Sequence, residues 1–323
     1  MQKEEIKLDL KDRKILAELD RDARQPFSHI ARKVKISKEL LHYRINRLEK
    51  LGVIESYYPI IDNSKLGLLT FRVYLRLQAI TPSKRSEIIN YLKQQKNVWA
   101  LALLSGNWDI VLVMGSRKLS IVYDILDAFL AKYKSSISSY NIATYTNIYH
   151  FIRDYLLDEK RVAPYKIFGL SQQADYDKTD EQILGILAKN ARISLLDISK
   201  AIGKTPEAIS YRIKQLEKKQ IILGYAVSIN LEKVGYLWYK ADISLTDMKQ
   251  LNTIIGYCSQ HPYITQVNRP LGSSDVEIEV YARNLQHFLS IMDELQNTFH
   301  GVIDHYTYFI VTQVFKVTFM PEE

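Results

Sequence analysis

Basic side chains are concentrated in two short segments of this 323-residue chain. Residues 32–50 contain seven lysines and arginines against two glutamates, and residues 200–219 contain six against two. These local balances of +5 and +4 together exceed the formal net charge of the whole chain, which is +8. Lysine and arginine neutralise phosphate groups, which supplies most of the non-specific affinity of proteins for DNA. A solvated helix face is the ordinary alternative for either segment alone, but two segments in matching positions favour DNA binding.

The two segments belong to an internal repeat. HYRINRLEKL at 42–51 recurs as SYRIKQLEKK at 210–219. Identical residues at an offset of 168, and later of 166, include Asp12 and Asp180, Gly67 and Gly235, Gly106 and Gly272, and Asp109 and Asp275. A period of this length indicates two tandem copies of a unit of roughly 150 residues, not a solenoid of short repeats.

Each copy begins with three predicted helices, which would position the basic segments. Apolar residues at helical spacing predict helices over about 9–22, 27–34 and 38–51, and again over 177–189, 195–202 and 206–219. Ser37 and Thr205 are good N-caps for the third helix of each copy. This order, with a polar outer face on the third helix, is typical of a helix-turn-helix. Residues 53–54 and 57–61 are expected to form the two strands of a small wing.

The remainder of each copy alternates strands and helices in the order βαββαβ, which is typical of a ferredoxin-like domain. In the strand predicted at 69–79, apolar residues such as Val73 alternate with polar ones such as Arg72 and Tyr74, so we expect a half-buried strand. A four-stranded sheet of this kind leaves one face without helices. A second copy of the domain commonly covers that face.

The two central strands of each copy are joined by the turns GNWD at 106–109 and GSSD at 272–275. Glycine, asparagine, serine and aspartate are the residues that a tight hairpin requires. The same residue types can bind a small ligand. On the residues alone, a structural role and a ligand role are about equally supported.

Composition excludes several classes of protein. A single cysteine, Cys258, allows neither an intrachain disulfide nor a multi-cysteine metal site. The seven histidines do not cluster at ligand spacing, and His305 is interpreted as a surface or sheet-edge residue. GxGxxG, P-loop and HExxH motifs are missing, so no catalytic residue, metal or cofactor is predicted. The charged start of the chain and the lack of a long apolar run predict a cytoplasmic location without membrane contact.

The expected fold class is α+β, with two copies of a winged helix-turn-helix followed by a ferredoxin-like βαββαβ domain. We expect the chain to divide into helix-turn-helix units at 1–62 and 177–230, ferredoxin-like domains at 63–150 and 231–323, and a linker at 151–176. The linker contains Pro164 and Gly169 and is expected to hold one strand at most.

This order of elements, with GNWD between the middle strands, resembles the Lrp/AsnC (feast/famine) family of transcription regulators. The matching sequence is ARQPFSHIARKVKISKELLHYRINRLEKLGVIESY in the first copy and YDKTDEQILGILAKNARISLLDISKAIGKTPEAISYRIKQLEKKQIILGY in the second. The resemblance covers nearly the whole chain except the linker. It implies DNA binding through the third helix and a ferredoxin-like (RAM) domain that senses small molecules.

The resemblance also implies which residues approach DNA. These are Ser37, Lys38, Glu39, His42, Tyr43, Arg44, Asn46 and Arg47 in the first copy and Thr205, Glu207, Ser210, Tyr211, Arg212, Lys214 and Gln215 in the second. Arginine side chains and the Ser37 backbone suit phosphate, whereas Tyr43 and Asn46 suit base edges. Since Asn46 is replaced by Lys214 and Arg47 by Gln215, the two helices should not read the same half-site.

A small-molecule effector, commonly an amino acid in this family, is expected around the two turns. The implied effector-binding residues are Gly106, Asn107, Asp109, Gly272, Ser273 and Asp275. The expected partners are therefore double-stranded DNA and an effector. The ferredoxin-like domains would either pair within one chain as a pseudo-dimer or join two chains as a homodimer.

Two alternatives to a sequence-specific DNA-binding regulator stay open. Siroheme decarboxylases share this fold, but the segments leading into the turns, VWALALLSGNWD and YITQVNRPLGSSD, contain no histidine. Apart from Arg269, they also contain no cationic group for a tetrapyrrole carboxylate. The second alternative, an architectural DNA-binding protein without an effector, would carry the same helices. The sequence favours a regulator that is not an enzyme.

Overall fold

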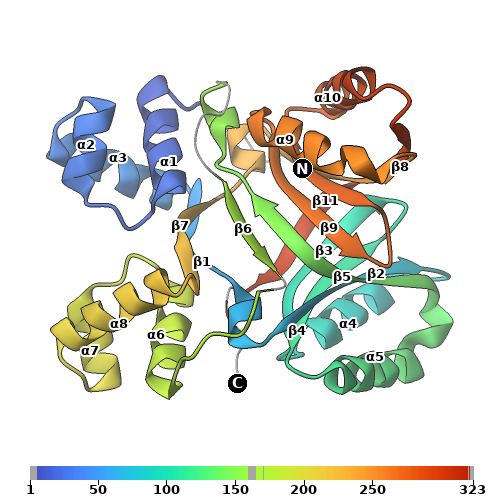
Figure 1. The fold of residues 1–323 in the computed structure, drawn as a ribbon, viewed down its shortest axis with the longest axis horizontal. Helices are drawn as coiled ribbons and strands as arrows, with labels where there is room; N and C mark the ends of the chain where they lie inside the picture. The colour runs from blue at the N-terminus through green and yellow to red at the C-terminus, as the bar shows by residue number, and fades with distance from the viewer. Residues whose placement is uncertain (1–5, 159–164, 170, 319, 321–323) are drawn as a thin grey trace.

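Two groups of three helices lie on one side of the molecule in the computed structural model, which describes residues 6–158, 165–169, 171–318 and 320 (Figure 1). They are α1 (Leu10–Arg21), α2 (Phe27–Val34) and α3 (Lys38–Lys50), and α6 (Lys178–Lys189), α7 (Leu195–Ile202) and α8 (Pro206–Lys218). Ser37 and Thr205 cap α3 and α8 as predicted, because each side chain accepts a hydrogen bond from the backbone three residues on. Both predicted three-helix units are present.

The expected two-stranded wing is replaced by one continuous strand in each copy. β1 (Ile54–Ile61) pairs antiparallel with β7 (Ile222–Ile229) of the other copy. Neither strand folds back on itself, because its backbone groups are satisfied by the equivalent strand from the other half. The prediction of separate strands at 53–54 and 57–61 was therefore wrong.

The helices of each copy dock on the β-strand of the other. α1 packs against β7, and α6 packs against β1. The backbone N–H of Ala23 donates to Tyr225 O at 3.0 Å, and that of Ala191 donates to Tyr57 O at 2.8 Å. Equivalent residues thus make equivalent bonds across the two copies. The two helix-turn-helix units form one body with a shared core.

The predicted βαββαβ order is confirmed in both copies. The first contains β2 (Leu69–Leu77), α4 (Pro82–Lys93), β3 (Val98–Gly106), β4 (Ile110–Ser116), α5 (Leu119–Tyr133) and β5 (Ile137–His150). The second contains β8 (Leu237–Leu245), α9 (Leu251–Gln260), β9 (Ile264–Leu271), β10 (Val276–Ala282), α10 (Leu285–Thr298) and β11 (Ile303–Val317). Short 3-10 turns connect several of these elements.

The eight long strands of the two copies close into a barrel. The order β2-β4-β3-β11-β8-β10-β9-β5 returns to its start, because β2 also pairs with β5. The two copies meet along the β3–β11 and β5–β9 edges. Closure removes the exposed strand edges that a separate four-stranded sheet would present. The four barrel helices cover the outside, with α4 on β3, α5 on β4, α9 on β9 and α10 on β10 (Figure 1).

Closure buries the polar face of β2 as well as its apolar face. Phe71, Val73 and Leu75 pack under α4 and α5, as their spacing predicted. Arg72 and Tyr74 point into the barrel and are only 7% and 1% exposed. The expectation of a half-buried strand was therefore wrong, since the opposite sheet covers what a lone sheet would leave in solvent.

The segment between the copies ties the helical body to the barrel. β6 (Lys166–Gly169), the one strand expected in the linker, extends the sheet beside β5. Arg153, buried just after β5, donates from its backbone to Asp20 Oδ2 at 2.7 Å and from Nη2 to the Tyr58 hydroxyl at 2.8 Å. The predicted linker also includes 159–164 and 170, and the predicted terminal domains include 1–5, 319 and 321–323, all of which lie outside the described residues. The division into domains stays a prediction.

No helix in the described part of the chain is long and apolar enough to cross a membrane. Among the same residues, no group of three or more histidine, cysteine, aspartate or glutamate side chains could hold a metal ion. Cys258 is buried on α9.

Candidate nucleic-acid interface and ligand pocket

The third helix of each copy presents a polar outer face that carries a prominent tyrosine. Leu41, Ile45 and Leu48 are buried beneath α3, whereas Tyr43 is 65% exposed. Tyr211, at the equivalent position on α8, is 64% exposed. The other exposed residues of the predicted DNA-contacting set are Ser37, Lys38, Glu39, His42, Asn46, Thr205, Glu207 and Lys214. The remaining members are half-buried: Arg44, Arg47, Ser210, Arg212 and Gln215.

Arg44 and Arg212 are held by the carboxylates that cap the first helix of their own unit. Arg44 Nη1 lies 2.7 Å from Asp9 and 2.9 Å from Asp12. The hydrogen bond to Asp9 raises the pKa of the Arg44 guanidinium, although burial opposes the shift. Arg212 makes the same pairs with Asp177 and Asp180, at 2.8 and 2.9 Å. Arg44 thus fastens α3 to the start of α1, and Arg212 fastens α8 to the start of α6.

Arg47 shares in this pairing, since its Nη2 lies 2.6 Å from Asp12. The structure shows a structural role for these arginines. The phosphate contacts predicted for them stay a prediction. Near the start of α3, Lys35 and Lys38 are exposed. A helix N-terminus with free N–H groups and nearby lysines suits a phosphate.

Both hairpin turns are built in the same way. Asp109 Oδ2 accepts the backbone N–H of Leu77 at 2.8 Å, and Asp275 Oδ2 accepts that of Leu245 at 2.8 Å. These two aspartates, predicted as effector ligands, therefore hold their turns against the neighbouring strand end.

The backbone structure also explains why both turns begin with glycine. Gly106 and Gly272 have φ angles of 135° and 104°, where side chains are strained. A Cβ on Gly106 would lie 2.9 Å from Tyr308 O, and one on Gly272 would lie 2.9 Å from Ile142 O. Both glycines thus permit the close approach of the strands that join the two copies.

The tips of the two turns converge on one pocket at a mouth of the barrel. This pocket, with a volume of about 250 Å³, is lined by Tyr74, Asn107, Trp108, Asn141, Asp242, Ser244, Ser273, Ser274, His305 and Thr307. Of the six predicted effector residues, only Asn107 and Ser273 line it. Tyr74 and Asp242 were missed, although they occupy equivalent positions near the ends of β2 and β8 and could have been found from the repeat.

Charged groups fill the barrel beneath this pocket. Glu277 is fully buried and pairs with Arg72 and, at 2.9 Å, with Lys240. The hydroxyls of Tyr74 and Tyr145 donate to its Oε2 at 2.6 and 2.9 Å. Burial by itself would raise the pKa of Glu277, but Arg72 and Lys240 hold this pKa below its ordinary value.

Asp242 lies between this charged cluster and the pocket. Burial, and then the charge of Glu277, raises the pKa of Asp242 to about 7, while Lys240 and Arg72 oppose the shift. Its Oδ1 is buried and accepts no hydrogen bond in the described structure. This carboxyl therefore has spare capacity to accept hydrogen bonds at neutral pH.

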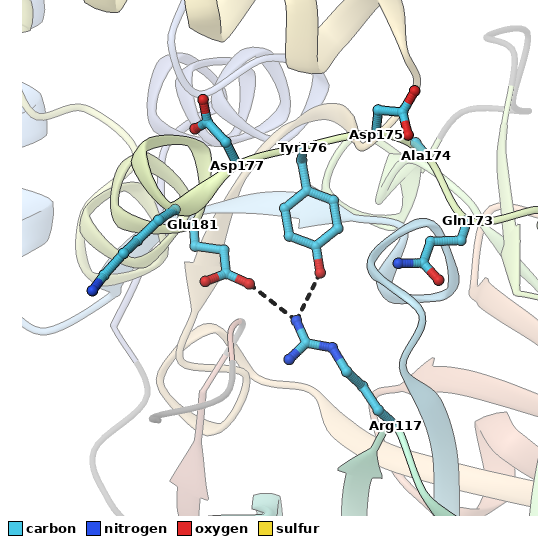
Figure 2. A pocket seen from close by; sticks show the side chains of 8 residues that line it. Arg117, Gln173, Ala174, Asp175, Tyr176, Asp177 and Glu181 are labelled. Atoms are coloured by element: carbon cyan, nitrogen blue, oxygen red, sulfur yellow. Dashed lines mark hydrogen bonds and ion pairs between the residues drawn. The ribbon is translucent and has the colours of Figure 1, made fainter.

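A second pocket, a groove of about 390 Å³, lies where the barrel meets the second helical unit. Figure 2 shows Arg117 reaching from the end of β4 to Tyr176 and Glu181 at the start of α6. Its Nη2 donates to the Tyr176 hydroxyl at 2.7 Å and to Glu181 at 3.0 Å. Arg283, the equivalent residue of the second copy, instead lies 3.6 Å from Asp158. Arg117 therefore connects the barrel to the second helical unit, whereas among the described residues Arg283 does not make the equivalent contact with the first.

Comparison with known proteins identifies both helical units. A family model described as winged helix-turn-helix DNA-binding matches residues 8–55 and 176–222. The HTH-type transcriptional regulator LrpA of Pyrococcus horikoshii is 34% identical over 125 residues, which cover 39% of this chain and 87% of that regulator. The regulator AldR of Mycolicibacterium smegmatis is 34% identical over 111 residues, 34% of this chain and 65% of that protein.

A solved structure shares the arrangement of the whole chain. The siroheme decarboxylase NirDL superposes with a TM-score of 0.64 over 96% of this chain and 94% of that one, at 12% sequence identity. At this identity the likeness concerns the fold alone. The sequence relatives, by contrast, are regulators that correspond to less than half of this chain. The chain therefore belongs to the Lrp/AsnC family of DNA-binding transcriptional regulators and carries two family units in tandem.

Proposed function

We propose that a single chain works as a complete two-fold regulator, with α3 and α8 binding one DNA duplex. The pairing of β1 with β7 carries this proposal, because it unites the two helix-turn-helix units in one body. Paired recognition helices in such proteins enter major grooves about one helical turn, or a multiple of it, apart. The barrel and the β1–β7 ribbon together set that spacing.

The two recognition helices would read different half-sites. Tyr43 and Tyr211 are equivalent and similarly exposed, so both are suited to base contacts. Asn46 suits adenine, whereas its counterpart Lys214 suits guanine or a phosphate. The preferred operator is therefore asymmetric, with one half-site for α3 and another for α8.

A small molecule bound at the barrel mouth would modulate DNA binding. β5 passes the pocket at Asn141 and ends at His150, and Arg153 follows three residues later. Arg153 is bonded to Asp20 on α1 and to Tyr58 on β1. A ligand that shifts β5 would therefore move a buried contact of the first helical unit.

The shared fold makes a siroheme-decarboxylase-like activity the second candidate. That activity would require free cations for the carboxylates of a tetrapyrrole. Arg72 and Lys240, two buried cations inside the barrel, are paired with Glu277 and Glu279. Because both cations are already paired with glutamates, they are poorly placed to bind tetrapyrrole carboxylates, which favours the DNA-binding regulator over the decarboxylase.

The proposal is tested by selecting fragments of the host genome on the purified chain and titrating their binding across salt concentrations. We expect fragment-selective binding by one chain per site, measured by the mass of the complex, with affinity falling as salt rises. Lys38→Glu/Lys204→Glu should abolish it, because both lysines are exposed at the recognition helices. Lys96→Glu/Lys249→Glu, at exposed positions on the barrel domains, is the matched control.

Equal losses in the two variants, or binding without fragment preference, would contradict the proposal. A complex that contains two chains per site would contradict the single-chain reading alone. An absorption band of a tetrapyrrole in the purified protein would instead support the decarboxylase candidate.

A further inference from the structure

The barrel-mouth pocket has two chemically different walls because the two copies have diverged. Tyr74 is equivalent to Asp242 at an offset of 168 residues, and Trp108 is equivalent to Ser274 at an offset of 166. All four side chains line the same pocket. In a dimer of identical chains these positions would be occupied by identical residues. Here one wall is aromatic and the other carries a carboxyl and a hydroxyl, so the pocket suits one asymmetric ligand.

The aromatic wall is held in place. The rings of Tyr74 and Trp108 stack with centroids 5.7 Å apart and an interplanar angle of 27°. The Tyr74 hydroxyl donates to Glu277 at 2.6 Å, and its ring also packs edge-on against Phe309. A tryptophan face beside a desolvated site attracts a cation through the quadrupole of the ring.

The opposite wall supplies an unsatisfied acceptor. On β8, Lys240, Asp242 and Ser244 alternate along the inward face from the barrel interior toward the mouth. Lys240 is committed to Glu277 and Glu279, at 2.9 and 2.6 Å. Asp242 Oδ1 is buried without a hydrogen-bond partner in the described structure.

The local charges leave the pocket with a negative surplus. Arg72 and Lys240 are matched by Glu277 and Glu279, so Asp242 is an additional carboxyl. None of the lining residues in the described part of the chain is a lysine or arginine. His305 lines the pocket, but its Nδ1 lies 2.8 Å from Asp304. Above the pKa of Asp242 the pocket thus attracts a positive group, and its described lining offers no lysine or arginine to a carboxylate.

We propose that this pocket binds one small organic cation, an amine without a carboxylate, between the Asp242 carboxyl and the Tyr74–Trp108 pair. The inference names the effector class for the proposed regulator and rests on that function for its biological meaning. It departs from the amino-acid effector expected from the family resemblance. An ammonium group donates to Asp242 and to the neighbouring serine hydroxyls, while its methylene chain lies against the aromatic rings.

Binding is expected to strengthen as pH rises. The groups that face Asp242 are Lys240 on its own strand, Arg72 and Tyr74 on β2, Glu277 on β10 and His305 on β11. Burial, and then the charge of Glu277, raises the pKa of Asp242 to about 7, while Lys240, Arg72 and the Ser274 hydroxyl oppose the shift. A cation binds the ionised carboxyl, so binding below that pH must release a proton.

The test is calorimetric titration of the full chain with 1,4-diaminobutane at pH 8, in parallel with L-lysine and hexanoate. We expect one diamine per chain, weaker binding of lysine because its carboxylate finds no partner, and no binding of hexanoate. Asp242→Asn keeps the shape of the side chain and should weaken diamine binding about tenfold or more. Trp108→Ser, which copies the residue found in the second copy, should weaken it as well.

Asp293→Asn, at an exposed aspartate on α10, is the matched control and should bind the diamine like the unaltered chain. Lysine binding as tight as diamine binding, or equal diamine affinity in Asp242→Asn, overturns the inference. Lack of diamine binding at pH 8 overturns it too.

DNA binding by the same samples separates this inference from the proposed function. A chain that binds DNA selectively but no diamine contradicts only the ligand assignment. A chain that binds the diamine but no DNA contradicts only the regulator.

Discussion

Arg44 on the recognition helix α3 lies 2.9 Å from the buried carboxylate of Asp12 on α1. Asp12 is 1% exposed, and it also receives a hydrogen bond from the N-cap residue Asp9. Arg212 and Asp180 repeat the relationship at the same distance in the second copy. Each of these arginines thus also stabilises the packing of its helix. A loss of DNA binding on its substitution can therefore come from lost stability as well as from a lost DNA contact.

Arg44→Ala is therefore expected to reduce stability as well as DNA binding. Removing the guanidinium leaves the buried Asp12 carboxylate with Arg47 as its remaining ion-pair partner, at a cost of about 1–3 kcal/mol in the free energy of unfolding. Urea denaturation measures this directly. Arg32→Ala, at an exposed residue of the same unit, is the control and should stay within about 0.5 kcal/mol of the unaltered chain. A stable Arg44→Ala chain with lost DNA binding would instead support a role in phosphate contact.

Tyr43→Ala and Tyr211→Ala should each relax sequence preference in a different half of the operator. Both side chains are highly exposed, so their removal should cost little stability. Loss of a base contact should reduce discrimination by about 1–3 kcal/mol in the half-site that the altered helix reads. Binding to the selected fragment and to half-site variants measures the effect. Tyr123→Ala, at a 67%-exposed tyrosine on α5, is the matched control. Identical half-site effects of the two variants would contradict the asymmetric reading.

Glu277→Ala should destabilise the barrel strongly. Glu277 is the buried carboxylate shared by Arg72 and Lys240, and its loss leaves these cations with Glu279. Removing one partner from a buried ion pair costs about 3–5 kcal/mol. The double variant Arg72→Ala/Glu277→Ala should lose less than the sum of the two single variants, because they share one interaction. Additive losses in urea denaturation would show that the pair is not coupled.

Stability should fall as pH rises from about 4 to about 7 through the titration of Asp242. Its folded-state pKa of about 7 lies above the ordinary value of 3.8, so the folded chain binds the proton more tightly than the unfolded chain does. The stabilisation is present when the carboxyl is protonated and is lost as pH rises through about 7. Asp242→Asn should remove this pH dependence and gain at least about 1 kcal/mol at pH 8. An unchanged pH profile in Asp242→Asn would assign the titration to another group.

The helical part of the candidate site could be predicted because its signals are local. The caps Ser37 and Thr205, the apolar spacing beneath α3 and the exposed Tyr43 and Tyr211 all follow from residues a few positions apart. The pocket could be predicted only in part. The family resemblance implied Asn107 and Ser273, which line the pocket, but it also implied Asp109 and Asp275, whose carboxylates accept backbone hydrogen bonds that hold the turns. Asp242 lies on a strand whose inward direction depends on a distant sheet.

By itself, the sequence determined the duplication, the three helices and the βαββαβ order of each copy, and a resemblance to a regulator family. The duplication and the elements follow from the repeat and from periodicities that each element carries alone, whereas the family was implied by a resemblance. Only the tertiary structure decided that β1 pairs with β7 and that the two sheets close into one barrel. The alternation along β2 shows that Arg72 and Tyr74 share a face, but not what covers that face. Pairing between strands more than a hundred residues apart turned that face into a buried charged interior and placed Asp242 at its mouth.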